Sequence, residues 1–258
     1  MTRLVAKYAA FSRVAMARAG RERGDLYGRV LFFAVILGVF SSLWRAAAES
    51  GLPTASEPRA LVWYLAVTEW IVLSTPQIHL DIQEAIRAGD VVYRLGRPAS
   101  YVAAELAATF GSLAVRLPLL GLTAFVCAFA FTGWIPPARA LVIVVPFGLV
   151  AAALHVWIGL LAFWLHDVSP VYWVCQKLMF VLGGLMLPLG VYPGAVQRVA
   201  AFTPFPALLA GPASFMLAGG GIAPATLARD LAIWCGVTAV GLGWTFRRAA
   251  ADLTVNGG

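Results

Sequence analysis

The stretch YVAAELAATFGSLAVRLPLLGLTAFVCAFAF, residues 101–131, contains only two charged side chains, Glu105 and Arg116. A helix crosses the hydrocarbon core of a bilayer with about 20 apolar residues, so this stretch is long enough to span a membrane. Further apolar stretches occupy residues 30–44, 61–80, 139–165, 171–189 and 227–246. We therefore expect an all-α polytopic membrane protein, with six transmembrane helices in a single domain over residues 1–258.

The composition agrees with this fold class. Hydrophobic residues make up 61% of the chain and charged residues 12%, whereas about 25% of the residues in a typical soluble domain are charged. So few charges argue against a soluble enzyme, a disordered regulator and a nucleic-acid-binding protein. The three cysteines, Cys127, Cys175 and Cys235, are far apart and lie in apolar runs, as is typical of small buried side chains.

The distribution of positive charge indicates the topology. Thirteen of the 19 Lys and Arg residues lie in residues 1–29, in the connections after the second and fourth apolar stretches and near the C-terminus, and five lie on the other side. Basic residues accumulate on the cytoplasmic side of membrane proteins, so we expect both termini in the cytoplasm. This bias also accounts for the net charge of +7 without a nucleic-acid partner.

Residues 1–29 have an amphipathic pattern. At 100° per residue, Arg3, Lys7, Arg18 and Arg21 share one side, and Leu4, Val5, Tyr8, Phe11 and Met16 share the opposite side. This pattern predicts a helix that lies in the membrane interface. No apolar core of 7–15 residues follows a short basic head, so we do not expect a signal peptide.

Two connecting segments carry further information. Residues 81–100 are expected to form a cytoplasmic connection with a short helix, which Gly89 ends before a turn at Arg97 and Pro98. Residues 188–224 lie on the outer side and contain six prolines and the run Gly219, Gly220 and Gly221. This apolar but interrupted segment predicts broken, re-entrant helices that dip into the outer leaflet.

A search for chemical motifs finds none that predicts catalysis. The chain lacks GxxxxGK[ST], HExxH and GxSxG, and its three histidines are scattered. We therefore expect no catalytic residue and no metal site, and no cofactor bound by this chain itself. If ATP drives the protein, another subunit binds the ATP and its Mg²⁺.

Two charged residues lie inside expected spans. Counting from the span ends at 1.5 Å per residue places Glu69 and Arg116 at similar depths, nearer the outer side. A lone charge in lipid is costly, so we expect these two side chains to pair or to line a polar translocation path. The alternative is that each extends toward the membrane surface or fixes helix packing.

Three blocks of sequence resemble a known family: IRAGDVVYRLGRPASY at 86–101, LAFWLHDVSPVYWVCQKLMFVLGGLMLPLGVYPGAVQRVAAFTPFPALLAGPA at 161–213, and LTVNGG at 253–258. With the pattern of six spans, the chain resembles the permease subunit of ABC-2 type exporters, in particular the compact bacterial group of ABC-2 family transporter proteins. The resemblance implies a place in the bacterial inner membrane. It also implies two permease subunits, as a homodimer or heterodimer, each docked to a separate ABC ATPase.

The resemblance further implies roles for named residues. The helix near residues 82–89 matches the coupling helix of the family, and its expected ATPase contacts are Ile82, Gln83, Glu84, Ile86, Arg87 and Asp90. A smaller contact is expected from His166 and Asp167, and close packing of the two permeases from Gly183 and Gly184. We expect export of a small hydrophobic or cationic compound. An ion-coupled secondary transporter or channel, and a membrane-embedded enzyme, are the alternatives.

Overall fold

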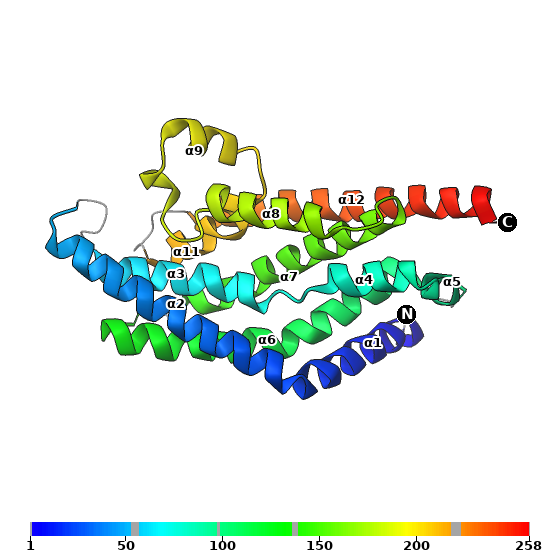
Figure 1. Ribbon diagram of the computed structural model, residues 1–258, viewed down its shortest axis with the longest axis horizontal. Coiled ribbons are helices and arrows are strands. Elements are labelled where there is room, and N and C mark those ends of the chain that lie inside the picture. The colour runs from blue at the N-terminus through cyan, green and yellow to red at the C-terminus, as the bar shows by residue number, and fades with distance from the viewer. Residues whose placement is uncertain (1, 53–56, 97–98, 136–138, 218–222, 258) are drawn as a thin grey trace.

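The computed structural model describes residues 2–52, 57–96, 99–135, 139–217 and 223–257, and all secondary structure in that part is helical. Long helices run along one axis and form an elongated bundle (Figure 1). They are α2 (Arg23–Glu49), α3 (Pro58–Ser74), α6 (Tyr101–Thr132), α7 (Arg139–Leu160) and α12 (Pro224–Gly257).

Shorter helices occupy the two ends of the bundle. At the end that carries both termini lie α4 (Ile78–Arg87) and α5 (Asp90–Leu95), as Figure 1 shows. Toward the opposite end, α8 (Ser169–Leu182) is followed by α9 (Gly194–Ala200), α10 (Phe205–Leu208) and α11 (Ala210–Leu217). Two short 3-10 turns, Leu161–Phe163 and Leu189–Val191, flank α8.

Several of these helices can cross a membrane. Within the described residues, α2, α6, α7 and α12 are long and apolar enough, and a bent pair, Gly194–Ala200 with Phe205–Met216, raises the number to five at most. By comparison, α3 has 17 residues and α8 has 14, fewer than the about 20 that a straight span requires. The chain is therefore an all-helical, multi-pass membrane protein by composition and helix length, and the count of six spans stays a prediction.

The segment after α8 is broken into short helices where it is described, and its re-entrant course on the outer side stays a prediction. Between residues 188 and 217 the chain forms only short helices, and the helices on either side of the break before Phe205 meet at 85°. Proline precedes or begins these helices because its ring fixes φ and its nitrogen donates no hydrogen bond. The expected run Gly219, Gly220 and Gly221 lies outside the described residues, as does the expected turn at Arg97 and Pro98.

The central helix of the bundle is α3. It contacts α2, α6, α7 and α11, and every side chain from Leu61 to Ile71 is buried. A helix that is covered on all sides can be apolar around its whole circumference, which is the pattern of this stretch. The outward faces of α2, α6 and α12 are apolar as well, and they are exposed at positions such as Val39, Leu122 and Val240. These faces are the surface that lipid would cover.

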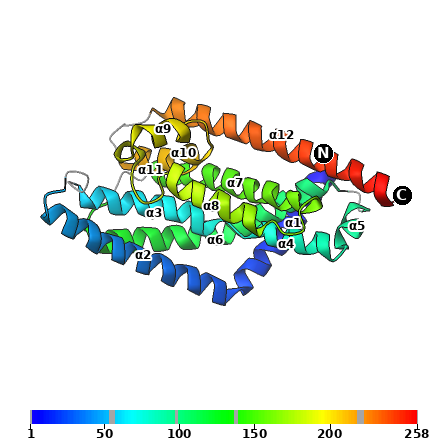
Figure 2. The ribbon, with the colours of Figure 1, turned by 45° about the horizontal axis from the view of Figure 1, so that its top comes forward.

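The N-terminal amphipathic segment differs from the expectation. A single interfacial helix over residues 1–29 was predicted, but α1 (Thr2–Arg21) ends at Arg21, and the chain turns at Glu22 into α2 (Figures 1 and 2). The helix α1 packs along the first half of α6, where the Ser12 hydroxyl donates a hydrogen bond of 2.7 Å to the Ala107 carbonyl. Amphipathicity predicts that one face is covered but does not say whether lipid or another helix covers it.

A glycine permits this close approach. A Cβ atom on Gly111 of α6 would fall on the backbone of Ser12. We expect Gly111→Ala to lower the free energy of unfolding by about 1–3 kcal/mol, because α1 must move away from α6. Gly243 of α12 is the control, since a Cβ there meets nothing within 4 Å, and Gly243→Ala should raise stability by up to about 1 kcal/mol. Unfolding in mixed detergent micelles measures both, and equal effects would contradict the close packing of α1 on α6.

Candidate functional site

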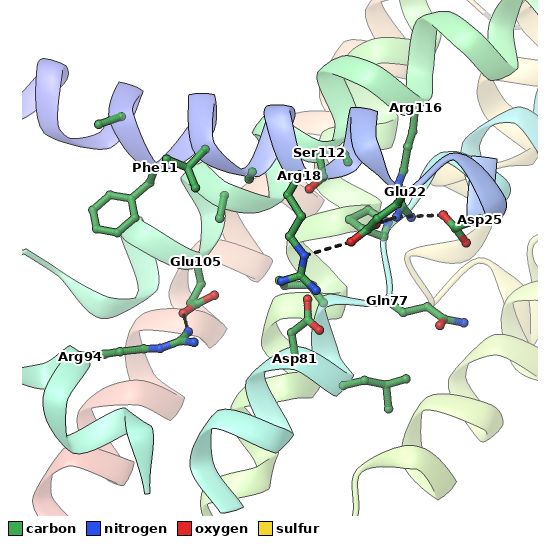
Figure 3. Close-up of a pocket in the computed structure, with 18 of the residues that line it drawn as sticks. Phe11, Arg18, Glu22, Asp25, Gln77, Asp81, Arg94, Glu105, Ser112 and Arg116 are labelled. Carbon is green, nitrogen blue, oxygen red and sulfur yellow. Dashed lines mark hydrogen bonds and ion pairs between the residues drawn. The ribbon is translucent and has the colours of Figure 1, made fainter. Parts of the chain in front are cut away.

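A charged cavity of about 780 Å³ lies where α1, α4 and α6 meet (Figure 3). Charged side chains from these helices, from the start of α2 and from the last turn of α5 line it. They are the basic Lys7, Arg18, Arg29, Arg94 and Arg116 and the acidic Glu22, Asp25, Asp81 and Glu105. Nine charged residues in one place are notable in a chain with 12% charged residues, and they make this cavity the main polar feature among the described residues.

Arg116 and Glu105 are the most buried charges of this cavity, each with 7% of its surface exposed. The Nη2 atom of Arg116 lies 3.1 Å from Asp25 Oδ2 and 3.5 Å from Glu22 Oε2, and Figure 3 shows both carboxylates beside the guanidinium. The Nε and Nη1 atoms have no hydrogen-bond partner among the described residues. The two carboxylates therefore supply the compensation that a buried guanidinium requires.

These carboxylates also bind other arginines and so connect four helices. Glu22 pairs with Arg18 at 3.0 Å, and Asp25 pairs with Arg29 at 2.9 Å. Arg29 Nη1 in turn donates a hydrogen bond of 2.6 Å to the carbonyl of Leu73, near the end of α3. We call Glu22, Asp25, Arg29 and Arg116 the elbow network, because it holds the turn between α1 and α2 against α3 and α6.

The predicted pairing of Glu69 with Arg116 is wrong. Glu69 is 3% exposed in the middle of α3, and no described residue forms an ion pair with it. The prediction assumed that α6 enters the membrane at its first residue. In the structure the first half of α6 packs against α1 instead, which places Arg116 level with the turn between α1 and α2.

The short helix predicted near residues 82–89 is present as α4, and one of its faces is covered. Ile82 is fully buried, and α4 packs against α7. Gln83 is also buried, and its Oε1 accepts a hydrogen bond of 2.6 Å from the backbone N–H of Val168. Arg87 Nε donates one of 2.7 Å to the carbonyl of His166. The expectation that Ile82 and Gln83 face a partner is therefore wrong, because α7 and the connection to α8 already occupy that face.

The accessible surface lies farther along the chain, at the tip formed by the end of α4 and by α5. Glu84, Arg87 and Asp90 are exposed there and Ile86 is half-buried. The exposed fractions of Val92 and Tyr93 on α5 are 64% and 79%. We call the set of Glu84, Arg87, Asp90, Val92 and Tyr93 the tip surface. The sequence analysis missed Val92 and Tyr93, although Gly89, which adopts the left-handed conformation at φ +76°, marks the start of a separate short helix.

The second expected contact lies in the connection between α7 and α8, and its role toward a partner stays a prediction. His166 and Asp167 are both exposed. The Asp167 carboxylate accepts hydrogen bonds from the backbone N–H and the hydroxyl of Ser169, at 2.9 and 2.7 Å. These bonds lower the pKa of the Asp167 carboxyl because they stabilise its charged form.

Gly183 and Gly184 do not lie on a surface that a second subunit could reach. Both are buried, and a Cβ on Gly183 would meet the Met179 carbonyl and the side chain of Leu209. Gly184 has a φ of +64°, which favours glycine, and its carbonyl accepts a hydrogen bond of 2.7 Å from the Tyr64 hydroxyl. The two glycines therefore reverse the chain after α8 within one subunit, and their predicted role in dimer packing is corrected.

The structure brings together two histidines that the sequence analysis treated as scattered. The rings of His79 on α4 and Tyr172 on α8 stack with centroids 3.9 Å apart, and the His155 ring on α7 lies 5.7 Å from that of His79. This three-ring cluster joins α4 to α7 and α8. It therefore links the helix beside the tip surface to the interior of the bundle.

The site as a whole joins a charged end of the bundle to its apolar helices through hydrogen bonds and ring contacts. Among the described residues, no three His, Cys, Asp or Glu side chains are placed to hold a metal ion. No family model, curated protein or solved structure matches this chain.

Proposed function

We propose that this chain is the permease subunit of an ATP-driven exporter of the ABC-2 type. The observation that carries the proposal is the tip surface. A valine and a tyrosine are exposed side by side on a six-residue helix, with charged residues around them and outside the apolar bundle. An exposed tyrosine with an apolar neighbour and a charged rim is the usual composition of a protein interface.

The proposed partner is an ABC ATPase. The sequence has no GxxxxGK[ST] motif, so ATP and Mg²⁺ would be bound by that separate chain. Glu84, Arg87 and Asp90 would form the polar rim of the contact, with His166 and Asp167 as a smaller second contact. The proposed binding surface for the ATPase is thus the tip surface, and not the face of α4 that carries Ile82 and Gln83.

The proposed topology has six spans in the bacterial inner membrane. They are α2, α3 with its continuation toward α4, α6, α7, α8 with the re-entrant helices that follow it, and α12. The excess of Lys and Arg at the end that carries α4, α5 and both termini supports a cytoplasmic location for that end. Two copies, or two related permeases, would associate through the apolar faces of α2 and α8.

A route for mechanical coupling supports the proposal. Closure of the ATPases would pull on α5 and α4. The bonds from Gln83 to Val168 and from Arg87 to His166, and the ring stack of His79 on Tyr172, would pass that movement to α7 and α8. Coupling between distant sites is carried by packed helices and side chains that can adopt two discrete arrangements.

Transport in inverted membrane vesicles tests the function. Vesicles that contain this chain and its proposed ABC ATPase partner are expected to accumulate a small hydrophobic compound when ATP is added. Accumulation should stop when the Walker A lysine of the ATPase is replaced. Accumulation that needs no ATPase and follows a proton gradient would replace the proposal with ion-coupled transport.

One observation favours that second candidate. Glu69 is a buried carboxyl with no ion-pair partner among the described residues, and buried acids of this kind act as proton relays in secondary transporters. If ATP drives the protein, Glu69→Gln is expected to keep the transport rate within about twofold, because glutamine preserves the shape of the side chain and no proton transfer is needed. Glu69→Ala, which leaves a space in the bundle, is the control for packing. Loss of transport in Glu69→Gln alongside normal folding would support the ion-coupled alternative.

A further inference from the structure

A second cavity, of about 350 Å³, lies between α7, α8, α10 and α12. Four aromatic side chains from these helices line it: Trp157, Tyr172, Phe205 and Trp244. Small-molecule sites in proteins have volumes of about 300–1,000 Å³ and are lined by apolar and aromatic side chains with a few polar groups. The second cavity has this size and this lining.

No Asp, Glu, Lys or Arg side chain is among the residues that line the second cavity. A charged ligand would therefore lose its hydration in the cavity and meet no opposite charge there, which is strongly unfavourable. Aromatic faces attract cations to some degree, but here no carboxylate adds to that attraction. The lining selects against charged ligands and favours flat apolar ones.

The polar groups of the lining define one more property of the ligand. Trp157 Nε1 donates to Thr245 Oγ1 at 2.8 Å, and Gln176 Nε2 donates to the Tyr172 hydroxyl at 3.0 Å. His155 Nδ1 lies 2.8 Å from the Ala151 carbonyl. A carbonyl only accepts, so Nδ1 carries the proton, and Nε2 of the neutral ring is an acceptor. Of the groups left over, His155 Nε2 and Gln176 Oε1 accept, whereas the Tyr172 and Thr245 hydroxyls, which accept in the bonds above, can still donate their own protons.

We propose that the second cavity binds an uncharged aromatic compound that carries a hydroxyl group, which can both donate and accept a hydrogen bond. The inference rests on the proposed export function in one respect, because it names the class of compound that is carried. It narrows that class from hydrophobic or cationic compounds to uncharged ones. The Tyr172 ring that lines the cavity also stacks on His79 of α4, so an occupant of the cavity would lie against a ring that itself contacts α4.

Photolabelling with 4-(hydroxymethyl)benzophenone tests the site, using the purified chain in phospholipid nanodiscs without any ATPase. On irradiation the ketone takes a hydrogen atom from a nearby C–H bond, and the two radicals then join to form a carbon–carbon bond, with a preference for methionine. Met179 lines the cavity and is buried, whereas Met186 is 37% exposed and is not part of the lining. The two methionines therefore distinguish the cavity from the lipid-facing surface in one experiment.

The expected result is an adduct on Met179 that exceeds the adduct on Met186. The analogue that carries a trimethylammonium group in place of the hydroxyl should label Met179 about tenfold less, which corresponds to about 1.4 kcal/mol of binding free energy. Cys175→Phe, which fills the cavity, should reduce the Met179 adduct by a similar factor. The matched control is Cys235→Phe, at an exposed position on α12 outside this lining, and it should leave the adduct unchanged.

Two results would overturn the inference. Labelling of Met186 equal to or above that of Met179 would mean that the probe only dissolves in the lipid around the chain. Equal labelling of Met179 by the charged analogue would mean that the cavity does not select uncharged ligands. The comparison of Met179 with Met186 uses the wild-type chain, so it does not depend on the folding of any variant. If that comparison contradicts the ligand site, the vesicle assay still tests ATP-driven transport independently.

Discussion

The double variant Glu22→Gln/Asp25→Asn is expected to lose about 3–5 kcal/mol of unfolding free energy, because it leaves the guanidinium of Arg116 buried without a carboxylate. Arg116 is 7% exposed and its two carboxylate partners are the ones replaced. The amide side chains keep the size and most hydrogen-bonding capacity of the acids. The loss is therefore one of charge compensation rather than of packing.

Replacing the arginine instead of the two acids is expected to cost less unfolding free energy. In Arg116→Met, the Glu22 and Asp25 side chains keep Arg18 and Arg29 as partners and are each 38% exposed. Water and these arginines compensate the two carboxylates, so the loss should be smaller than in the double variant. The triple variant, which removes the arginine and both acids, should recover most of the stability.

Unfolding in mixed micelles measures all three variants. Asp230→Asn serves as the control, since it breaks an exposed pair with Arg229 on α12, and such pairs contribute about 0–1 kcal/mol. A double variant that is no less stable than Arg116→Met would contradict the elbow network as described. So would a triple variant that is the least stable of the set.

The second large effect concerns the tip surface. Replacing both Val92 and Tyr93 with glutamate is expected to weaken the binding of the ATPase about 30-fold or more, because truncation of a central aromatic residue in an interface costs about 2 kcal/mol. Both side chains are exposed on α5, so the substitution removes no internal packing. Stability of the chain alone should therefore stay unchanged.

A matched variant separates this surface from exposed apolar residues in general. Val14 of α1 is 71% exposed and is not part of the tip surface, and Val14→Glu should leave ATPase binding intact. Titration of the detergent-solubilised chain with the ATPase gives the dissociation constants. Unchanged binding by the Val92→Glu/Tyr93→Glu variant would remove α5 from the interface, and an equal effect of Val14→Glu would show that the charge acts non-specifically.

The apolar runs predicted the helices better than they predicted what the helices contact. Residues 101–131 and 227–246 both lie within long apolar helices, because length and hydropathy are local properties of the chain. Which element packs against α1 was not predictable in the same way. An amphipathic pattern is the same whether lipid or α6 lies against it, and only the absent Cβ of Gly111 hints at a neighbouring backbone.

The charged residues show the same limit. Arg116 was correctly identified as a charge that needs a partner, but depth counted along two separate helices selected Glu69, whereas the partners come from the turn between α1 and α2. That turn depends on where α1 ends, which the sequence leaves open by several residues. Ile82 and Gln83 were assigned to the right helix and to the wrong side of it. Their burial depends on α7, which is distant in the sequence.

The most direct test of the central claim is the composition and activity of the complex that the chain forms in its own membrane. We would purify the tagged full chain in a mild detergent, identify what it retains by mass spectrometry, and measure ATP hydrolysis. The proposal predicts a protein with Walker A and ABC signature motifs in equal amount to the chain, with hydrolysis that falls when Val92 and Tyr93 are replaced by glutamate. A chain that transports its compound while retaining no such ATPase would contradict the proposal.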